Sequence, residues 1–222
     1  MDKSEALVFS TQDKVGELSG NIKATRQDWL DAAMALLVEG GASEVKVLTI
    51  GARLGVSRSS FYWYFRDRED LLDQLLGEWE RTNTEILRRH CAMPAETITE
   101  AVCNLFRCLV GKNQFNYRLD FAVREWARRD ASIRQVIDRA DTARTQAIAE
   151  MFLRHGYEPS EADIRARVLY YQQIGYYTLD LAESLEERLS RVDGYLLAFT
   201  GEKPRPKEVN AFVAYARSQS EP

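Results

Sequence analysis

Residues 48–72 read LTIGARLGVSRSSFYWYFRDREDLL, a segment in which two short helical patterns flank a glycine. A first helix is predicted from about Lys46 to Leu54, and Gly55 supplies the turn that follows it. Ser57 can begin a second helix, because its hydroxyl can accept a hydrogen bond from a free backbone N–H. A helix, a short turn that contains glycine and a second helix together have the spacing of a helix-turn-helix unit.

The second helix contains five consecutive aromatic residues. At about 100° per residue these side chains go around the helix, so they cannot all face one core. Phe61 and Phe65 are four residues apart and are predicted to be buried together. Tyr62, Trp63 and Tyr64 then face other directions, either into further packing or towards a partner. The arginines on both sides of the run favour DNA as that partner.

An amphipathic helix is predicted upstream of this segment, from Arg26 to Val38, and two glycines end it. The three helices together form a head over residues 22–68, with the helix-turn-helix motif at about residues 46–65. The preceding residues 1–21 are polar and are expected to be a flexible N-terminal segment.

The chain has 222 residues and a net charge of −4, but its charge is distributed unevenly. From Val45 to Arg68, five basic residues accompany one acidic residue, so this window carries +4 and the rest of the chain −8. A basic patch on an acidic protein indicates docking to one anionic surface such as double-stranded DNA. An architectural protein that coats DNA without sequence preference remains an alternative, which the acidic balance of the whole chain disfavours.

The cysteines and histidines predict neither a metal site nor a cofactor. Cys91, Cys103 and Cys108 match no zinc-ligand spacing, and His90 and His155 lie far apart in the chain. We interpret the three cysteines as reduced thiols, with a redox-sensing role left open.

Several other classes of protein are disfavoured by patterns that the sequence lacks. No run of 18 apolar residues is present and the N-terminus does not resemble a secretory signal, so no membrane partner and a cytoplasmic location are expected. An all-helical enzyme with an added head is an alternative from a different class. The sequence offers no acid–base pair, nucleophile–histidine arrangement or phosphate-binding glycine loop, so we expect no enzymatic activity.

Residues 69–222 are predicted to form a larger helical domain, because no alternating strand pattern occurs after residue 70. Ser160 is predicted to cap the helix that begins after Pro159. Helices are expected at about residues 67–90, 96–110, 117–128, 130–154, 160–181, 185–199 and 206–218.

Two apolar stripes in this domain require packing partners. The first lies on the helix that ends near residue 181, and the second steps by 4, 3, 4 and 3 residues, which is typical of a helix in a bundle. Such stripes pack either within the chain or against a second subunit. The stripes comprise Ile164, Val168, Tyr171 and Gly175, followed by Leu185, Leu189, Val192, Leu196 and Phe199.

The segment at residues 48–72 resembles the DNA-binding signature of the TetR family of bacterial transcriptional regulators. Ile50, Leu54, Gly55, Val56, Ser57, Tyr62, Phe65 and Leu71 match that signature. The chain departs from it at Ser59, where glycine is common, at Tyr64, where histidine is common, and at Gly51, where alanine is usual. These departures bear on which operator sequence is read, and less on DNA binding itself.

The resemblance implies an all-α protein in which the head binds a palindromic operator and the body binds a small-molecule effector and forms a homodimer through both stripes. It implies a regulator, more often a repressor that the effector releases from DNA. The implied DNA-binding residues are Lys46, Thr49, Ser57, Arg58, Ser59, Ser60, Tyr62, Trp63, Tyr64, Arg66 and Arg68. The candidate residues of the effector pocket are Trp79, Phe106, Phe121, Trp126 and Phe152, and for each of them plain core packing is the favoured alternative.

Overall fold

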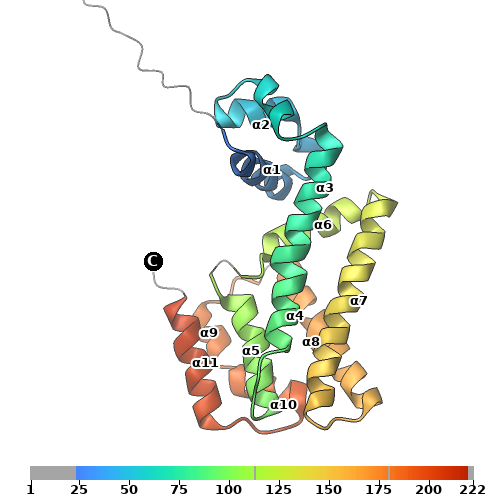
Figure 1. Ribbon diagram of the computed structural model, residues 1–222. Helices are drawn as coiled ribbons and strands as arrows, with labels where there is room; N and C mark the ends of the chain where they lie inside the picture. Colours follow the sequence, from blue (N-terminus) through green and yellow to red (C-terminus); the bar gives the residue numbers. More distant parts are fainter. Residues whose placement is uncertain (1–23, 113, 180, 220–222) are drawn as a thin grey trace, which may run out of the picture.

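The computed structural model describes residues 24–112, 114–179 and 181–219, and within these ranges the chain forms helices and no strands. The predicted all-α class with an N-terminal helix-turn-helix is confirmed. Figure 1 shows a small head that stands at one end of a taller helical body. The predicted N-terminal segment at residues 1–21 lies outside the described residues.

The head begins with α1 (Arg26–Gly40), whose first turn is held by reciprocal capping between Thr25 and Asp28. The Thr25 hydroxyl accepts from the Asp28 backbone N–H at 3.2 Å, and the Asp28 carboxylate accepts from the Thr25 backbone N–H at 2.7 Å. A short 3₁₀ turn, η1 (Ala42–Glu44), connects α1 to α2 (Val47–Leu54).

Residues 48–72 form the turn of the helix-turn-helix motif and supply part of the core of the head. Gly55 ends α2 with a φ of 68°, a left-handed conformation that favours glycine. Phe61 and Phe65 are both buried, as predicted, and their rings stack with centroids 5.1 Å apart. The Trp29 ring of α1 packs edge-on against Phe61 at 5.2 Å. The buried aromatic rings therefore fix the segment after the turn against α1.

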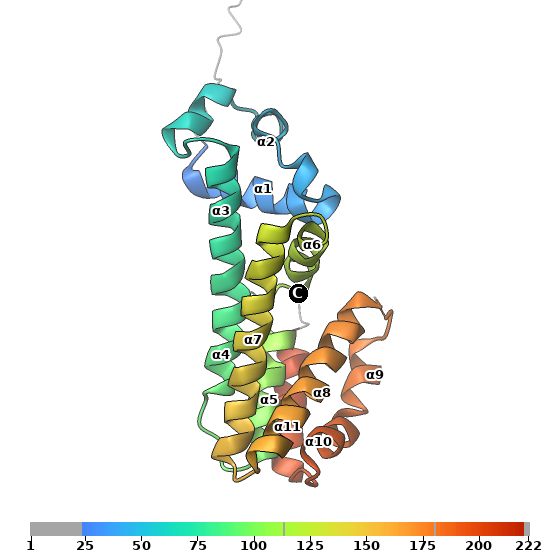
Figure 2. The same cartoon turned by 90° about the vertical axis from the view of Figure 1, so that its right-hand side faces the viewer.

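A single long helical path leaves the head and runs along the body (Figure 2). It consists of α3 (Arg68–Trp79), a π-helical segment η3 (Glu80–Glu85) and α4 (Ile86–Cys91). Within η3, Asn83 donates its side-chain amide to the Asn116 carbonyl at 2.9 Å, and Thr84 accepts from Arg144 at 3.0 Å. The helix predicted at residues 67–90 is confirmed. Its π-helical segment, η3, was not predicted from the sequence.

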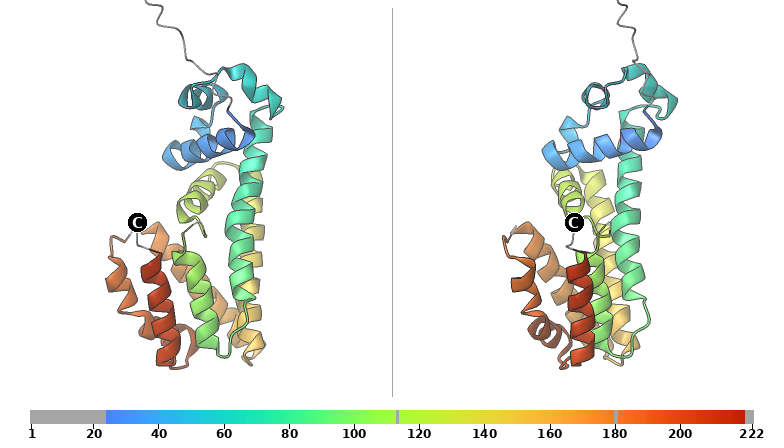
Figure 3. Two further views of the ribbon diagram at one scale, coloured as in Figure 1. Left: turned by 60° about the vertical axis from the view of Figure 1, so that its left-hand side comes forward. Right: turned by 90° about the vertical axis from the view of Figure 1, so that its left-hand side faces the viewer.

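The remaining helices complete the body and support the head. Figure 3 shows α1 lying across α6, and side chains of α1, α3, α6 and α7 share one hydrophobic core. A second core joins α4, α5 and α7 to the C-terminal helices. These helices are α5 (Ile98–Val110), α6 (Tyr117–Ala127), α7 (Ala131–Arg154), α8 (Pro159–Thr178), α9 (Leu185–Leu189), α10 (Val192–Thr200) and α11 (Pro206–Ser218).

Two local predictions in the body are wrong. Ser160 does not cap α8, because the helix begins one residue earlier at Pro159 and its N-cap is Glu158. Proline is favoured at the first helical position, since the missing N–H has no intrahelical partner there. The helix expected at residues 185–199 is two helices, α9 and α10, separated at residues 190 and 191.

A cluster of buried charges connects α3, α6, α7 and α8. Asp120 accepts hydrogen bonds from Trp79 at 2.9 Å, from Arg144 at 2.8 Å and from Arg124 at 2.8 Å. Arg124 also forms an ion pair with Asp141, which accepts a hydrogen bond from the Tyr170 hydroxyl of α8 at 2.6 Å. Two positive and two negative side chains thus balance in the interior, as buried charges require.

Candidate DNA-binding surface and effector cavity

The outer surface of α2 and of the following turn, η2 (Arg58–Trp63), carries the predicted DNA-binding side chains. Trp63 is 71% exposed and Tyr62 is 57% exposed, although the neighbouring Phe61 is fully buried. Arg58 is exposed, and it has no ion-pair partner in the described part of the chain. Large aromatic side chains seldom lie in water without a function, so this surface is a candidate for contact with a partner.

The segment that carries these side chains is a 3₁₀ helix and not the α-helix predicted from the sequence. Its backbone N–H groups bond three residues back, from Ser60 to Ser57 at 3.2 Å and from Tyr64 to Phe61 at 3.0 Å. Ser57 precedes the segment but forms no side-chain cap, because its hydroxyl lies 2.7 Å from that of Ser59. The capping role predicted for Ser57 is therefore wrong, while its position at the start of the segment is as expected.

The basic side chains near this surface differ in how closely they pair with acidic side chains of the head. Lys46 lies at the start of α2, 3.4 Å from Glu44, and Arg66 is highly exposed at 3.6 Å from Asp70. Arg53 is bound by both oxygens of Glu39 at 2.7 Å, and this hydrogen bonding lowers the pKa of Glu39. Arg53 thereby ties α2 to α1.

Arg68 is placed differently from the prediction. Its guanidinium donates to the Val45 carbonyl at 2.7 Å and to the Ala42 carbonyl at 2.6 Å, and it also pairs with Glu69. These bonds hold η1 and the start of α2 against α3. The Arg68 guanidinium therefore already makes hydrogen bonds inside the head. Arg68 is therefore less available for a phosphate contact than the sequence predicted, and that assignment stays an untested prediction.

Other predicted residues lie at the edge of the same surface. Thr49 and Tyr64 are half-buried, and the Tyr64 ring packs edge-on against Phe65 with centroids 6.5 Å apart. Ser60 donates its hydroxyl to the Ser57 carbonyl at 2.8 Å. Leu48 was not predicted, yet it is 66% exposed on α2. Its position in a predicted amphipathic helix, off the Val47–Ile50–Leu54 face, was the signal available in the sequence.

The two apolar stripes separate in the structure. Ile164, Val168 and Tyr171 on α8 are between 52% and 59% exposed, and Leu197 on α10 is 48% exposed. Arg165 links the two helices by donating to the Phe199 carbonyl at 2.8 Å. We refer to Ile164, Val168, Tyr171 and Leu197 as the α8/α10 face. Gly175 lies further along α8 and is half-buried.

The second stripe faces inward and is not an exposed interface. Leu189, Val192, Leu196 and Phe199 are all buried within the single chain, where they pack into the core of the body, and Leu185 is half-buried beside them. The prediction that these residues form the dimer interface is therefore wrong. Helical spacing indicates burial, but it does not indicate which chain provides the other side.

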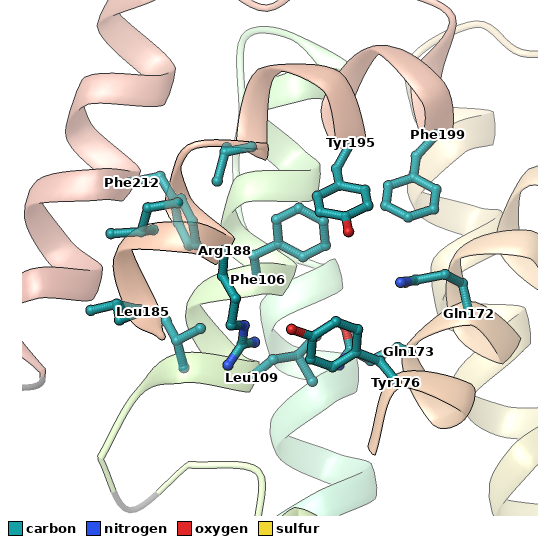
Figure 4. A pocket seen from close by; sticks show the side chains of 13 residues that line it. Phe106, Leu109, Gln172, Gln173, Tyr176, Leu185, Arg188, Tyr195, Phe199 and Phe212 are labelled. Carbon is teal, nitrogen blue, oxygen red and sulfur yellow. The ribbon is translucent and has the colours of Figure 1, made fainter. Parts of the chain in front are cut away.

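A cavity of about 70 Å³ lies among α5, α8, α9, α10 and α11. Figure 4 shows aromatic side chains around it, with Phe106, Tyr195 and Phe199 near one another. Of the five residues predicted for the effector pocket, only Phe106 lines this cavity.

The other four predicted pocket residues lie elsewhere. Trp79 and Phe152 are fully buried in the two cores, and Trp79 is occupied by its hydrogen bond to Asp120. Phe121 is exposed on α6, and Trp126 is half-buried near the end of the same helix, beside the end of α1. Large aromatic residues were a poor guide, because most of them build the core.

Polar residues that were not predicted also line the cavity, among them Gln172, Gln173 and Arg188. Two adjacent glutamines inside the aromatic run YYQQIGYY were a signal that could have identified the first two. Arg188 carries no such signal, since a single arginine in a short amphipathic helix is usually solvated.

Within the described ranges, no helix is long and apolar enough to cross a membrane. In the same residues, no three His, Cys, Asp or Glu side chains gather as metal ligands would.

The fold and the exposed surface define a helix-turn-helix protein with a separate helical body. Residues 30–75 match the family model described as bacterial regulatory proteins, tetR family. A stretch of 62 residues is 36% identical to the HTH-type transcriptional regulator AcrR of Shigella flexneri. That match covers 28% of this chain and 27% of AcrR.

Solved structures extend the likeness to the whole fold. SmeT, the repressor of the Stenotrophomonas maltophilia multidrug efflux pump SmeDEF, is 21% identical with a TM-score of 0.55, over 83% of this chain and 98% of SmeT. AmtR of Mycobacterium smegmatis is 19% identical with a TM-score of 0.52, over 91% of this chain and 98% of AmtR. At these identities the likeness establishes a shared fold.

Proposed function

We propose that the protein is a sequence-specific transcriptional regulator that acts in the cytoplasm, and that a small molecule releases it from a palindromic operator. The observation that carries this proposal is the exposure of Arg58, Tyr62 and Trp63 beside the buried Phe61. An arginine can reach guanine in the major groove, a tyrosine hydroxyl can bind phosphate, and an indole can contact a thymine methyl group.

The two proposed roles belong to two consecutive parts of the chain. Residues 22–68 form the DNA-binding domain, and residues 69–222 form the domain for effector binding and dimerisation. Base contacts come from Arg58, Ser59 and Trp63, and phosphate contacts come from Lys46, Tyr62, Tyr64 and Arg66. Thr49, Ser57 and Ser60 complete the surface.

Selection from a random duplex library at near-physiological salt tests the proposal. Recovery of a palindrome is the expected result, whereas affinity with a steep salt dependence and no preferred sequence would indicate an architectural protein instead. Arg58→Ala is expected to weaken operator binding by about 1–3 kcal/mol. Arg81→Ala removes an exposed arginine on η3 that is paired with Glu78, and this control should leave binding unchanged.

We further propose that two copies of the chain associate through the α8/α10 face. Its exposed apolar side chains form a continuous candidate interface. A dimer also supplies two heads, which can read half-sites about 34–36 Å apart on one side of the duplex.

Light scattering on charged variants tests this interface. Val168→Glu combined with Leu197→Glu is expected to yield monomers, since each carboxylate would be buried without a partner. Leu153→Glu places the same charge on an exposed leucine of α7 and should leave the dimer intact. An intact dimer in the double variant would locate the interface elsewhere.

A further inference from the structure

The side chains that line the cavity among α5, α8, α9, α10 and α11 carry a net positive charge. Among the residues that the structure describes, its lining includes one cationic side chain, Arg188 of α9, and no aspartate or glutamate. The other lining residues are apolar or aromatic, apart from two glutamines and the tyrosine hydroxyls. A cavity of this composition attracts an anion and disfavours a cation.

The Arg188 guanidinium is available for a ligand. It lies over the Tyr176 ring at 5.1 Å from the centroid, and no carboxylate lies within ion-pairing distance of it in the described part of the chain. The nearby Glu183 accepts from the Tyr176 hydroxyl and pairs with Arg191. Glu183 is thus committed to these two partners, while stacking on Tyr176 orients Arg188 beside the cavity (Figure 4).

A second donor in the lining lacks an acceptor. The side-chain amide nitrogen of Gln173 is buried and has no hydrogen-bond partner among the described residues. Leaving such a donor unsatisfied is unfavourable, because the group has given up its hydrogen bonds to water without gaining another. Gln173 also lines a small cavity of about 10 Å³ between α8 and the helices α4, α5 and α7, so it borders both spaces. An acceptor oxygen on a ligand would recover that cost.

The apolar walls favour a flat ring. Phe106 packs against Phe199 with centroids 6.1 Å apart at 74°, and the Tyr195 ring stacks on Phe199 at 6.1 Å. Aromatic rings prefer such edge-on and offset arrangements with one another. The volume of about 70 Å³ is about half that of a cavity of roughly 150 Å³ that binds benzene, so it excludes a fused ring system and admits a single ring only when the lining side chains move apart.

We propose that this cavity binds a single-ring aromatic carboxylate, whose ring lies among Phe106, Tyr195 and Phe199 and whose carboxylate meets Arg188 and Gln173. The charged pair with a guanidinium fixes orientation, because arginine and carboxylate match in a planar, two-bond geometry. The proposal rests on the proposed function only in treating this ligand as the effector.

Calorimetric titration of the full-length protein, without DNA, tests the ligand class with three probes of similar size. Benzoate carries a negative charge, benzamide is neutral and benzylamine is positively charged. Benzoate is expected to bind about tenfold more tightly than benzamide, and benzylamine most weakly. Equal binding of the three probes, a preference for benzylamine, or no binding at millimolar concentrations would overturn the proposal.

Substitutions then locate the binding. Arg188→Gln should weaken benzoate about tenfold and leave benzamide nearly unchanged, whereas Gln173→Leu should weaken both. Arg217→Gln, at an exposed arginine of α11 paired with Glu186, is the matched control and should change neither. Unfolding curves that match the parent protein show that each variant is folded, and unchanged benzoate affinity in folded Arg188→Gln would refute the assignment.

The two proposals fail independently. Benzoate binding that depends on Arg188, in a protein that selects no DNA sequence, would uphold the ligand and remove the regulatory function. Selection of a palindrome without benzoate binding would do the reverse.

Discussion

Asp120 is the carboxylate on which the buried charge cluster depends, and replacing it with asparagine has a calculable cost. Asparagine has the shape of aspartate and keeps an oxygen that can accept the hydrogen bond from Trp79. It has no charge, however, so the positive charges of Arg144 and Arg124 are opposed only by Asp141. Arg144 is fully buried, so its charge cannot be compensated by water. Removing one partner of a buried pair costs about 3–5 kcal/mol. That is a large part of the roughly 5–15 kcal/mol that stabilises a typical domain.

Urea unfolding followed by circular dichroism measures this loss at neutral pH. Asp138→Asn, on the exposed side of α7 and paired with Arg134, is the control and should cost less than about 1 kcal/mol. A loss below about 1 kcal/mol in Asp120→Asn as well would refute the reasoning, because the cluster would then tolerate an uncompensated charge.

The same carboxylate predicts how stability depends on pH. Burial opposes ionisation of Asp120, but the guanidinium groups of Arg144 and Arg124 outweigh it, so the pKa is lowered from 3.8. A lowered carboxylate pKa contributes stability that is complete above the unfolded value and is lost as the pH falls through the folded one. We therefore expect acid unfolding below pH 3.8 to be shifted to higher pH in Asp120→Asn, which lacks this contribution at every pH.

The remaining predictions concern the turn, the head and the thiols. Gly55→Ala should destabilise the protein by about 1–2 kcal/mol through its positive φ alone, since an added Cβ meets no atom within 4 Å, whereas Gly77→Ala in the middle of α3 should stabilise it. Arg68→Met should lower the unfolding midpoint of the head without changing the salt dependence of DNA binding; a reduced slope would restore Arg68 as a phosphate contact. Burial raises the pKa values of Cys103 and Cys108 to about 12, so neither thiol should react with Ellman's reagent at pH 8 before unfolding.

The head could be predicted in detail because its determinants are local. Two phenylalanines four residues apart identify the buried side of the last segment, and the residues between them are then exposed. Gly55 identifies the turn without any tertiary information. The 3₁₀ geometry after Ser57 could not be predicted, because burial of Phe61 and Phe65, four residues apart, is the pattern of an ordinary α-helix.

The site in the body could be predicted much less well, since its residues converge from distant segments. Leu189 and Leu196 have the spacing of buried residues, but only the tertiary structure shows that α5 and α8 cover them. Arg68 resembles any exposed arginine until its carbonyl partners, 23 and 26 residues earlier, come into contact. The candidate role of Arg188 likewise depends on its stacking against Tyr176 and its place in the cavity lining, neither of which the sequence shows.

The π-helical segment η3 sets the angular relation between the two ends of the long helix that joins head and body. A π-turn contains about one residue more than an α-turn, so loss of one residue within Glu80–Glu85 would restore an α-turn and leave α4 at nearly its present rotation relative to α3. The same loss within α3 would rotate the rest of the long helix by about 100°. Because α3 belongs to the head and α4 to the body, η3 is the part of this helix where a residue can be lost without turning the DNA-binding surface away from its present direction relative to the α8/α10 face.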